Sequence, residues 1–458
     1  MKYFEEITKV PRPSGQLTAI QDYLINFAKK HNLESEKDSA GNVLIKHPGI
    51  FSKKHIILQS HQDMVPAVRD GSAFVFGKDS VTFYVKDGWM YADETSLGAD
   101  DGTGIAVSLD ALVSEELQDC SFDCIFTADE ETTMNGVRNI SPAWLFADAL
   151  INIDSEEWGS VCVSCAGGAV VETVFHPVLE NMPTASCYRL SVSGLRSGHS
   201  GIMIDSGRLN AVRTGAEFLS ELHDVRLISC TGGSAKNVIP GTAEFMFTAA
   251  DAQICSLAAA FAKSHAAETD PDLKMEIEPV SASTIPWTKE STAQILSALS
   301  SVPNGCFKRS ASGPLLSSNL GVLRTEADGT VSVTCFVRGN DNVECEAKAA
   351  EIKKFFDDAG AETSVSDKFP GWKEPEDSSL LQMVKDVYRS MFNAEISVYT
   401  THGGLEGGYF AEKNPVLQIV SIGPDIENPH TVFERLNVDS FLRLKEFVYA
   451  LVKENCGK

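Results

Sequence analysis

Short, continuous apolar runs alternate with amphipathic segments in the first third of the chain. Four runs have the length and composition of buried β-strands: 43–45, 55–59, 124–127 and 150–153. Helical periodicity covers residues 3–31, with a Pro- and Gly-containing break at 10–15, and returns at 102–117. Strands that alternate with helices predict an α/β domain with a mainly parallel sheet covered by helices.

The pattern changes after residue 183, where apolar and polar positions begin to alternate. This second pattern predicts strands at 188–193, 243–247 and 331–336 and amphipathic helices near 208–223, 252–266, 291–301 and 345–359. Alternation with one polar face is typical of an antiparallel α+β layer. Beyond residue 369, a predicted helix at 380–391 and an apolar strand at 416–420 return to the first pattern.

These two patterns predict a catalytic domain that is interrupted by an inserted one. Residues 1–184 and 369–458 would form the α/β catalytic domain, and residues 185–368 would form an inserted α+β lid domain. A chain of 458 residues is too long for one compact core, so a division into domains is expected.

Composition and charge narrow the class of protein. The apolar content of 43% and charged content of 22% are ordinary for a soluble globular protein. The net charge of −24 argues against nucleic acid or an anionic membrane surface as a partner. We see no secretory signal, and no run reaches the roughly 18 apolar residues that span a bilayer. Eleven cysteines without a framework spacing favour reduced thiols and a cytoplasmic location.

Acidic and histidine-bearing clusters follow three of the predicted strands. These clusters are His61 with Asp63, Glu130 with Glu131, and Asp154. Open α/β sheets bind ligands beyond the carboxyl ends of their strands, and His, Asp and Glu are ligands that zinc accepts. The pattern therefore predicts a hydrolase with a two-metal site at that edge of the sheet.

Taken singly, each candidate also has an ordinary structural explanation. His61 would then be a satisfied surface or core histidine, and Asp100 a helix N-cap in its Gly-flanked turn. The adjacent carboxylates of Glu130 and Glu131 are harder to explain this way, because they repel each other unless a cation is present.

The joint pattern favours the metal site. His430, after the strand at 416–420, would supply a second histidine. The carboxylates of Asp100, Glu131 and Asp154, together with a bridging hydroxide, would balance the charge of two Zn²⁺ ions. Glu130 would then remain available as a base.

Motifs along nearly the whole chain resemble those of the zinc-dependent dipeptidases related to carboxypeptidase G2. The likeness is greatest to the bacterial aminoacyl-histidine dipeptidase group, of the Xaa-His or carnosinase type. The matching segments include 61–66, 97–100, 153–157, 165–168, 198–201, 237–240, 303–305, 370–372, 402–407 and 421–424. Their common order along the chain makes this resemblance specific.

The resemblance implies a role for each matching residue of the metal site. Asp100 would bridge both metals, His61 and Asp154 would complete one site, and Glu131 and His430 would complete the other. Asp63 would orient His61, and Glu130 would be the general base. The family also carries a cis peptide bond after the bridging aspartate, here Asp100–Asp101. The chain departs from the family at Thr132–Thr133 and at Asp101–Gly102.

The resemblance also implies how a substrate is held. His199 would steady the oxyanion, often across a dimer, so a homodimer through the inserted domain is implied. Arg338, helped by Asn237, would pair with the substrate's terminal carboxylate. Glu406 would meet its free amino group. Each residue also has a structural alternative. His199 would be a buried turn histidine, Arg338 an exposed strand-end arginine, and Glu406 an acid in a surface turn.

The leading hypothesis is a di-zinc dipeptidase that acts on Xaa-His or broader dipeptides through a metal-activated water. Mn²⁺ or Co²⁺ are possible substitutes for Zn²⁺. A deacylase or carboxypeptidase acting on N-acylated amino acids is the alternative enzyme, and a catalytically inactive relative is the non-enzymatic one.

Overall fold

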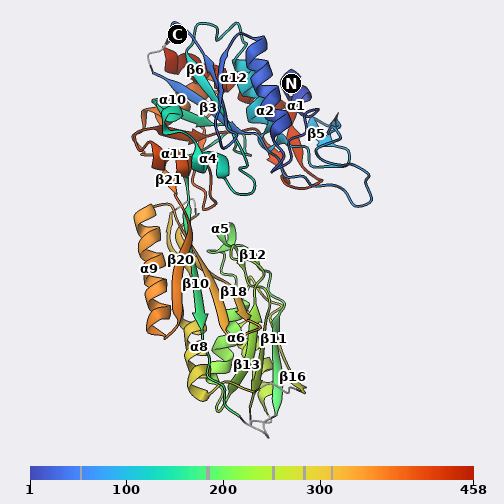
Figure 1. The fold of residues 1–458 in the computed structure, drawn as a ribbon, viewed down its shortest axis with the longest axis vertical. Helices are drawn as coiled ribbons and strands as arrows, with labels where there is room; N and C mark the ends of the chain where they lie inside the picture. The colour runs from blue at the N-terminus through green and yellow to red at the C-terminus, as the bar shows by residue number, and fades with distance from the viewer. Residues whose placement is uncertain (52–53, 182–185, 250–252, 282–284, 311–312, 458) are drawn as a thin grey trace. The chain divides into compact units, whose positions relative to one another are not determined.

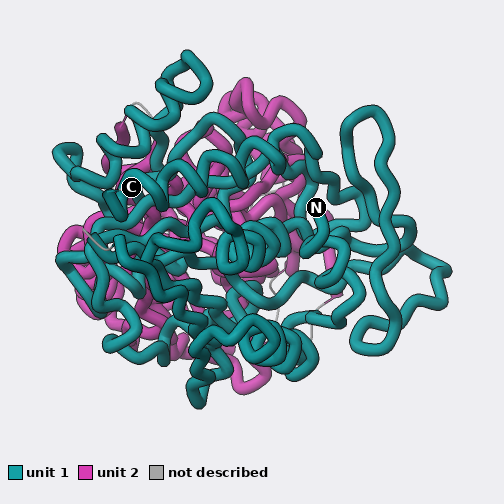
Figure 2. The backbone as a smooth tube through the Cα atoms, turned by 90° about the horizontal axis from the view of Figure 1, so that it is seen from above, with its two compact units in different colours: residues 1–164, 372–400, 405–458 teal, residues 165–371, 401–404 magenta. Residues whose placement is uncertain are grey.

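The structure, a computed structural model, describes residues 1–51, 54–181, 186–249, 253–281, 285–310 and 313–457 (Figure 1). It divides into two compact units. Unit 1 comprises residues 1–164, 372–400 and 405–458, and unit 2 comprises residues 165–371 and 401–404 (Figure 2).

Unit 1 is built around an eight-stranded sheet with the order β1-β2-β6-β3-β7-β23-β8-β22. Its strands are β1 (Glu34–Lys37), β2 (Val43–His47), β3 (Ile56–His61), β6 (Phe122–Thr127), β7 (Ala149–Asn152), β8 (Ser160–Cys162), β22 (Ser397–Tyr399) and β23 (Gln418–Ser421). The central neighbours β6, β3, β7 and β23 run parallel, whereas β1 and β2 add antiparallel strands at one edge. The predicted α/β class with a mainly parallel sheet is confirmed.

Helices cover this sheet because each buries one apolar face. The principal ones are α1 (Lys2–Ile7), α2 (Thr18–Lys30), α3 (Ala99–Ala111), α10 (Ser379–Phe392), α11 (Gly407–Lys413) and α12 (Val438–Cys456). Ile56 and Leu58 of β3 belong to the same apolar cluster as Ile105 of α3 and Leu444 of α12. The strand is therefore buried, as the continuous apolar run predicts.

Two helix predictions need correction. The helix predicted at 102–117 ends at Ala111, because Ser114 and the residues around it form turns in which the Leu117 N–H donates to the Ser114 carbonyl. Helix α12 was not predicted, although Phe441, Leu444 and Val448 recur at helical spacing after the N-cap Asn437.

Unit 2 is an antiparallel layer. Its nine-stranded sheet contains β10 (Gly167–Phe175), β11 (Cys187–Ser193), β13 (Arg226–Gly232), β15 (Ala243–Thr248), β16 (Lys274–Val280), β17 (Gly305–Ser310), β18 (Gly313–Thr325), β19 (Val331–Gly339) and β20 (Glu362–Phe369). Its longer helices are α6 (Ala211–Glu221), α7 (Ile254–His265), α8 (Lys289–Ser301) and α9 (Asn342–Asp358). The registers of its strand pairs are antiparallel, as predicted.

The bounds of unit 2, residues 165–371 and 401–404, differ from the expected 185–368. The expected first boundary, after residue 184, lies inside unit 2, because β10 pairs with β19 on one side and with β20 on the other. Most of β10 is a continuous apolar run like those of unit 1, so its composition alone assigns it to the first pattern.

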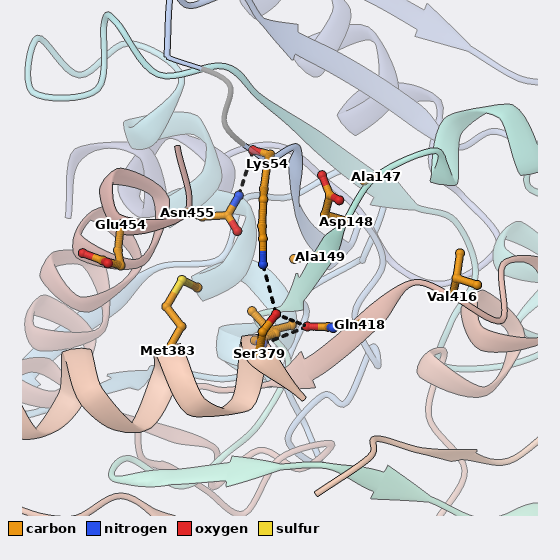
Figure 3. A pocket seen from close by; sticks show the side chains of 11 residues that line it. Lys54, Ala147, Asp148, Ala149, Ser379, Met383, Val416, Gln418, Glu454 and Asn455 are labelled. Atoms are coloured by element: carbon orange, nitrogen blue, oxygen red, sulfur yellow. Dashed lines mark hydrogen bonds between the residues drawn. The ribbon is translucent and has the colours of Figure 1, made fainter. Parts of the chain in front are cut away.

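A cavity of about 410 Å³ lies at the amino ends of β3, β7 and β23, where Lys54, Ala149 and Gln418 line it (Figure 3). Lys54 Nζ donates to Ser379 Oγ at 3.0 Å, and Gln418 Oε1 accepts the Leu380 N–H at 2.8 Å. These polar groups satisfy one another. The candidate residues of the metal site follow the opposite, carboxyl ends of the parallel strands.

None of the helices in the described parts of the chain combines the length and apolar character needed to cross a bilayer. No disulfide joins the eleven cysteines, all of which lie within the described residues.

Candidate metal centre

Five side chains of unit 1 converge at the carboxyl edge of its sheet. His61 is the last residue of β3, Asp100 lies in the first turn of α3, Glu131 follows β6, Asp154 follows β7, and His430 lies after β24 (Ile426–Glu427). Because β3, β6 and β7 are parallel, their carboxyl ends meet at one edge. Residues distant in the sequence therefore become neighbours.

The Asp100 carboxylate stands between the two histidines. Its Oδ1 lies 2.9 Å from His61 Nε2, and its Oδ2 lies 3.0 Å from His430 Nε2. Asp154 Oδ1 lies 3.3 Å from His61 Nε2, and Glu131 Oε2 lies 3.0 Å from His430 Nε2. One histidine and one further carboxylate thus gather at each oxygen of Asp100.

The donor set fits divalent cations. Ligand atoms of His61, Asp100 and Glu131 all lie within 4.8 Å of one another, and Glu131 Oε1 is buried without a partner among the described residues. Hydrogen bonds to Asp100 and Glu131 raise the pKa of His430 to about 11. Burial lowers the pKa of His61, but the nearby carboxylates of Asp154 and Asp100 outweigh it and raise this pKa. The carboxylates thus attract positive charge, which bound divalent cations would supply in place of protons.

Glu434 and Arg12 hold the turn that carries Asp100. Glu434 accepts the N–H groups of Gly98 at 2.8 Å, Ala99 at 2.8 Å and Asp100 at 3.2 Å. Arg12 is buried and donates to the carbonyl of Gly98. The N-cap of α3 is Gly98, so Asp100 is not the N-cap and its carboxylate is free to face the histidines.

The sequence analysis assigned no role to Arg12 or Glu434. For Glu434 the sequence offers one signal, its position four residues after His430. For Arg12 it offers no signal, because the residues adjacent in the sequence do not distinguish a buried arginine from an exposed one. The peptide bond Asp100–Asp101 is cis, as predicted.

The Asp63 carboxylate contacts the turn that carries Glu130 and Glu131 more closely than it contacts His61. Its Oδ1 accepts the Glu130 N–H at 3.0 Å, and its Oδ2 accepts the Glu131 N–H at 3.2 Å. His61 Nδ1 lies 3.1 Å from the main-chain oxygen of Asp63 but 3.6 Å from its carboxylate. Although burial opposes it, the nearby His61 ring and the hydrogen bond from the Glu130 N–H hold the pKa of Asp63 at about 2. The predicted orienting contact therefore falls to the Asp63 carbonyl.

The threonines that depart from the family pattern stabilise this turn. Asp129 adopts a left-handed φ of 60°, which aspartate tolerates better than most residues. Thr132 Oγ1 donates to Asp129 Oδ1 at 2.7 Å, and Thr133 donates to Oδ2. Burial, together with Asp154 and other nearby carboxylates, raises the pKa of Glu130 well above its ordinary value. Glu130 is thus held near the five convergent side chains by its backbone.

Arg338 of unit 2 is a buried cation without a carboxylate partner among the described residues. It is 6% exposed, its Nη1 donates to the His402 carbonyl at 3.3 Å, and its Nε has no partner there. Burial lowers its pKa to about 10. The alternative of an exposed strand-end arginine is wrong, because β19 carries Arg338 into the interior of the unit.

His199 lies in the same unit, in β12 (Gly198–His199), which pairs with β14 (Val238–Ile239). Its Nδ1 is buried without a partner in the described residues, and burial together with the charge of Arg338 lowers its pKa. Asn237 supports the adjoining turn, since its carbonyl accepts the Ser200 N–H at 2.8 Å. Both effects favour the neutral form of the imidazole.

His402 is a buried histidine of unit 2 for which we predicted no role from the sequence. Its Nδ1 lies 3.1 Å from Asn340 Oδ1, and its Nε2 lies 2.8 Å from Ser317 Oγ. Burial and the charge of Arg338 lower its pKa to about 3. These contacts fix the loop at 401–404, in which the His402 carbonyl accepts a hydrogen bond from Arg338.

Glu406, the predicted contact for a substrate amino group, is buried in unit 1. Its side chain is 1% exposed, and its Oε2 accepts bonds from Gln59 at 2.7 Å and Thr127 at 2.8 Å. Burial raises its pKa to about 8. The side chain points into unit 1 because α11 begins directly after it and packs beside β23.

Comparison with known proteins identifies the family. The sequence pattern of Peptidase family M20/M25/M40 matches residues 57–454. The chain belongs to this family. It is 31% identical to the cytosol non-specific dipeptidase of Escherichia coli (strain K12) over 467 aligned residues, which cover 98% of this chain and 96% of that protein.

Solved structures of similar proteins agree with this M20 assignment. The aminoacylhistidine dipeptidase of Vibrio alginolyticus is similar with a TM-score of 0.90 and 30% identity, covering 99% of this chain and 96% of that one. The aminopeptidase PepT of Bacillus cereus ATCC 10987 shares the fold, with a TM-score of 0.60 and 16% identity over 100% and 98% of the two chains.

Proposed function

We propose that this M20 peptidase is a metal-dependent dipeptidase that hydrolyses the peptide bond of Xaa-His or broader dipeptides. The observation that carries the proposal is the Asp100 carboxylate, whose two oxygens face His61 and His430 separately. The names of two relatives, the cytosol non-specific dipeptidase and the aminoacylhistidine dipeptidase, support the same class of substrate.

Two Zn²⁺ ions are the proposed cofactors. His61 and Asp154 would hold one ion and Glu131 and His430 the other, with Asp100 shared between them. When bound, such a pair supplies a water of lowered pKa and polarises the scissile carbonyl. Imidazole and carboxylate ligands also suit Mn²⁺ and Co²⁺, so the donor set is compatible with these ions.

Glu130 is the proposed general base. Its backbone is held by Asp63, and its raised pKa suits a group that takes a proton from water and delivers it to the leaving amine. Asp63 acts as a positioning residue for Glu130 and Glu131.

Unit 2 is proposed to recognise the substrate. A buried arginine without a carboxylate partner in the described residues suits the terminal carboxylate of a dipeptide, which Arg338 would bind through paired N–H groups. A neutral His199 would donate a hydrogen bond to the carbonyl oxygen as negative charge develops there. Asn237 would support this contact through its turn.

Burial of Glu406, the predicted contact for a free amino group, favours a second candidate. A deacylase or carboxypeptidase acting on N-acylated amino acids or other short peptides needs no such anchor. Comparing hydrolysis of Ala-His with hydrolysis of N-acetyl-Ala-His separates the two functions.

Activity on Ala-His should disappear when the protein is treated with a chelator and return when Zn²⁺ or Mn²⁺ is added. Activity that survives complete metal removal would contradict the proposed function. Selective hydrolysis of the N-acetyl compound would favour the second candidate.

We also propose a cytoplasmic homodimer that associates through unit 2. The name of the Escherichia coli relative and the free thiols support the location, and the family resemblance supports the dimer. Sedimentation of the purified protein tests the oligomeric state.

A further inference from the structure

A buried polar network in unit 1 ends at Glu406. Gln59 Nε2 donates to Glu406 Oε2 at 2.7 Å, and Thr127 Oγ1 donates to the same oxygen at 2.8 Å. Asn152 Nδ2 donates to Gln59 Oε1 at 2.7 Å. All four side chains are buried, so the network links three strands to the start of α11 without solvent.

The network adjoins the proposed metal ligands: Gln59 and Asn152 lie two residues before His61 and Asp154, and Thr127 lies level with His61. Gln59 and His61 are two residues apart on β3, so their side chains share a face of the sheet, about 6.6 Å apart along the strand. Asn152 is the register partner of Gln59 and precedes Asp154 by two residues. Thr127 is the register partner of His61. Each strand that carries a ligand thus also contributes one member of the network.

A carboxylate at this place needs an explanation. Burying one without a lysine or arginine partner is costly, and an apolar side chain would fill the same space. Glu406 makes no ion pair with a basic side chain within the described residues, and its Oε1 is buried there without a partner. Its Oε2, in contrast, receives both donors. Removing this acceptor would leave Gln59 Nε2 with only its 3.1 Å contact to Thr127 Oγ1, and would leave the Thr127 hydroxyl with only a longer contact, 3.4 Å, to the Ser60 carbonyl.

We propose that Glu406 is a positioning residue of the metal centre: its Oε2 collects Gln59 and Thr127 and thereby fixes the ends of β3 and β6, and of β7 through Asn152. The inference rests on the proposed function, because it assigns Glu406 to the same site. It replaces the expected contact between Glu406 and the substrate with a contact that acts through the strands.

The test compares E406A with E406Q, which keeps an acceptor oxygen. Co²⁺ is titrated into each apoprotein and followed by absorbance, and kcat and KM for Ala-His are measured separately. Loss of a group that supports metal ligands typically lowers metal affinity by about 10–100-fold. E406A should show such a loss and a lower kcat, with KM within about twofold of the wild type. E406Q should restore the affinity to within about threefold.

The matched control is E412Q, which changes an exposed glutamate on the same helix and should behave as the wild type. Wild-type Co²⁺ affinity in E406A would overturn the proposal. So would a raised KM at unchanged kcat, which would make Glu406 a substrate contact. An E406Q protein as weak as E406A would overturn the acceptor role.

If E406A does not fold, T127V provides a milder test, because it removes one donor while keeping the side-chain shape. It should lower Co²⁺ affinity by about threefold to tenfold, and no change would count against the network. A wild-type protein that binds Co²⁺ but hydrolyses no dipeptide would refute the proposed function and leave the positioning role standing.

Discussion

Glu130 is the residue whose chemistry can be separated most cleanly from metal binding. Within the described residues its side chain has no hydrogen-bond partner, whereas its N–H is fixed by Asp63. Replacing it by glutamine removes the base and leaves the five proposed ligands in place. We expect E130Q to lower kcat for Ala-His by about 10²–10⁴ while metal content stays unchanged.

Steady-state kinetics and elemental analysis of the same E130Q preparation check this expectation. Activity above a tenth of the wild-type value would remove Glu130 from the role of base. A loss of bound metal in parallel would make it a ligand instead.

Arg338 should control affinity for the substrate's terminal carboxylate. Hydrogen bonds to charged groups contribute about 1.5–3 kcal/mol, which corresponds to about 10–100-fold in kcat/KM. R338A should therefore lower kcat/KM for Ala-His by this factor. It should have little effect on C-terminally amidated Ala-His, which lacks the carboxylate. An equal loss on both compounds would show that Arg338 serves only the fold of unit 2.

At the scale of elements, strands were easier to predict than helix ends. The apolar run at 55–59 overlaps β3, and the run at 124–127 lies within β6. Such continuous apolar runs are typical of strands that are buried on both faces of a sheet. The end of α3 and the assignment of β10 depend on tertiary contacts, which periodicity does not contain.

Some features of the candidate site could be predicted from the sequence, and others could not. Residues such as His61, Asp100 and Asp154 could be singled out because they follow strands or open a helix. Burial of Glu406, which occurs through strands more than 270 residues away, leaves no local signal.

The loop at 401–404 provides a test of stability against pH. The pKa of His402 is about 3 in the folded protein against an ordinary 6.5, because burial and Arg338 oppose its charge. As pH falls below 6.5, the unfolded chain takes up a proton that the folded protein refuses until about pH 3. This histidine therefore lowers the free energy of unfolding progressively as the pH falls from 6.5 to about 3.

The H402N variant lacks this proton uptake. The free energy of unfolding of the wild type, relative to that of H402N, should therefore fall by about 1.4 kcal/mol for each pH unit between 6 and 4. Urea unfolding of both proteins at several pH values measures it. A constant difference across this range would show that His402 titrates alike in the folded and unfolded states.

At the scale of the whole molecule, the account divides the work between two units. Unit 1 carries the five proposed ligands and the base, and unit 2 carries the proposed substrate contacts Arg338 and His199. The sequence resemblance indicated this division, whereas the folds of the separate units follow from their hydrophobic patterns.

The central claim is that five side chains hold two divalent ions, with Asp100 shared between them. Zn²⁺ titration of the apoprotein by calorimetry, with wild type, H430A and D100A side by side, tests it most directly. We expect two ions per chain for the wild type, one tightly bound ion for H430A, and loss of tight binding at both sites for D100A. Two tightly bound ions in D100A would contradict it.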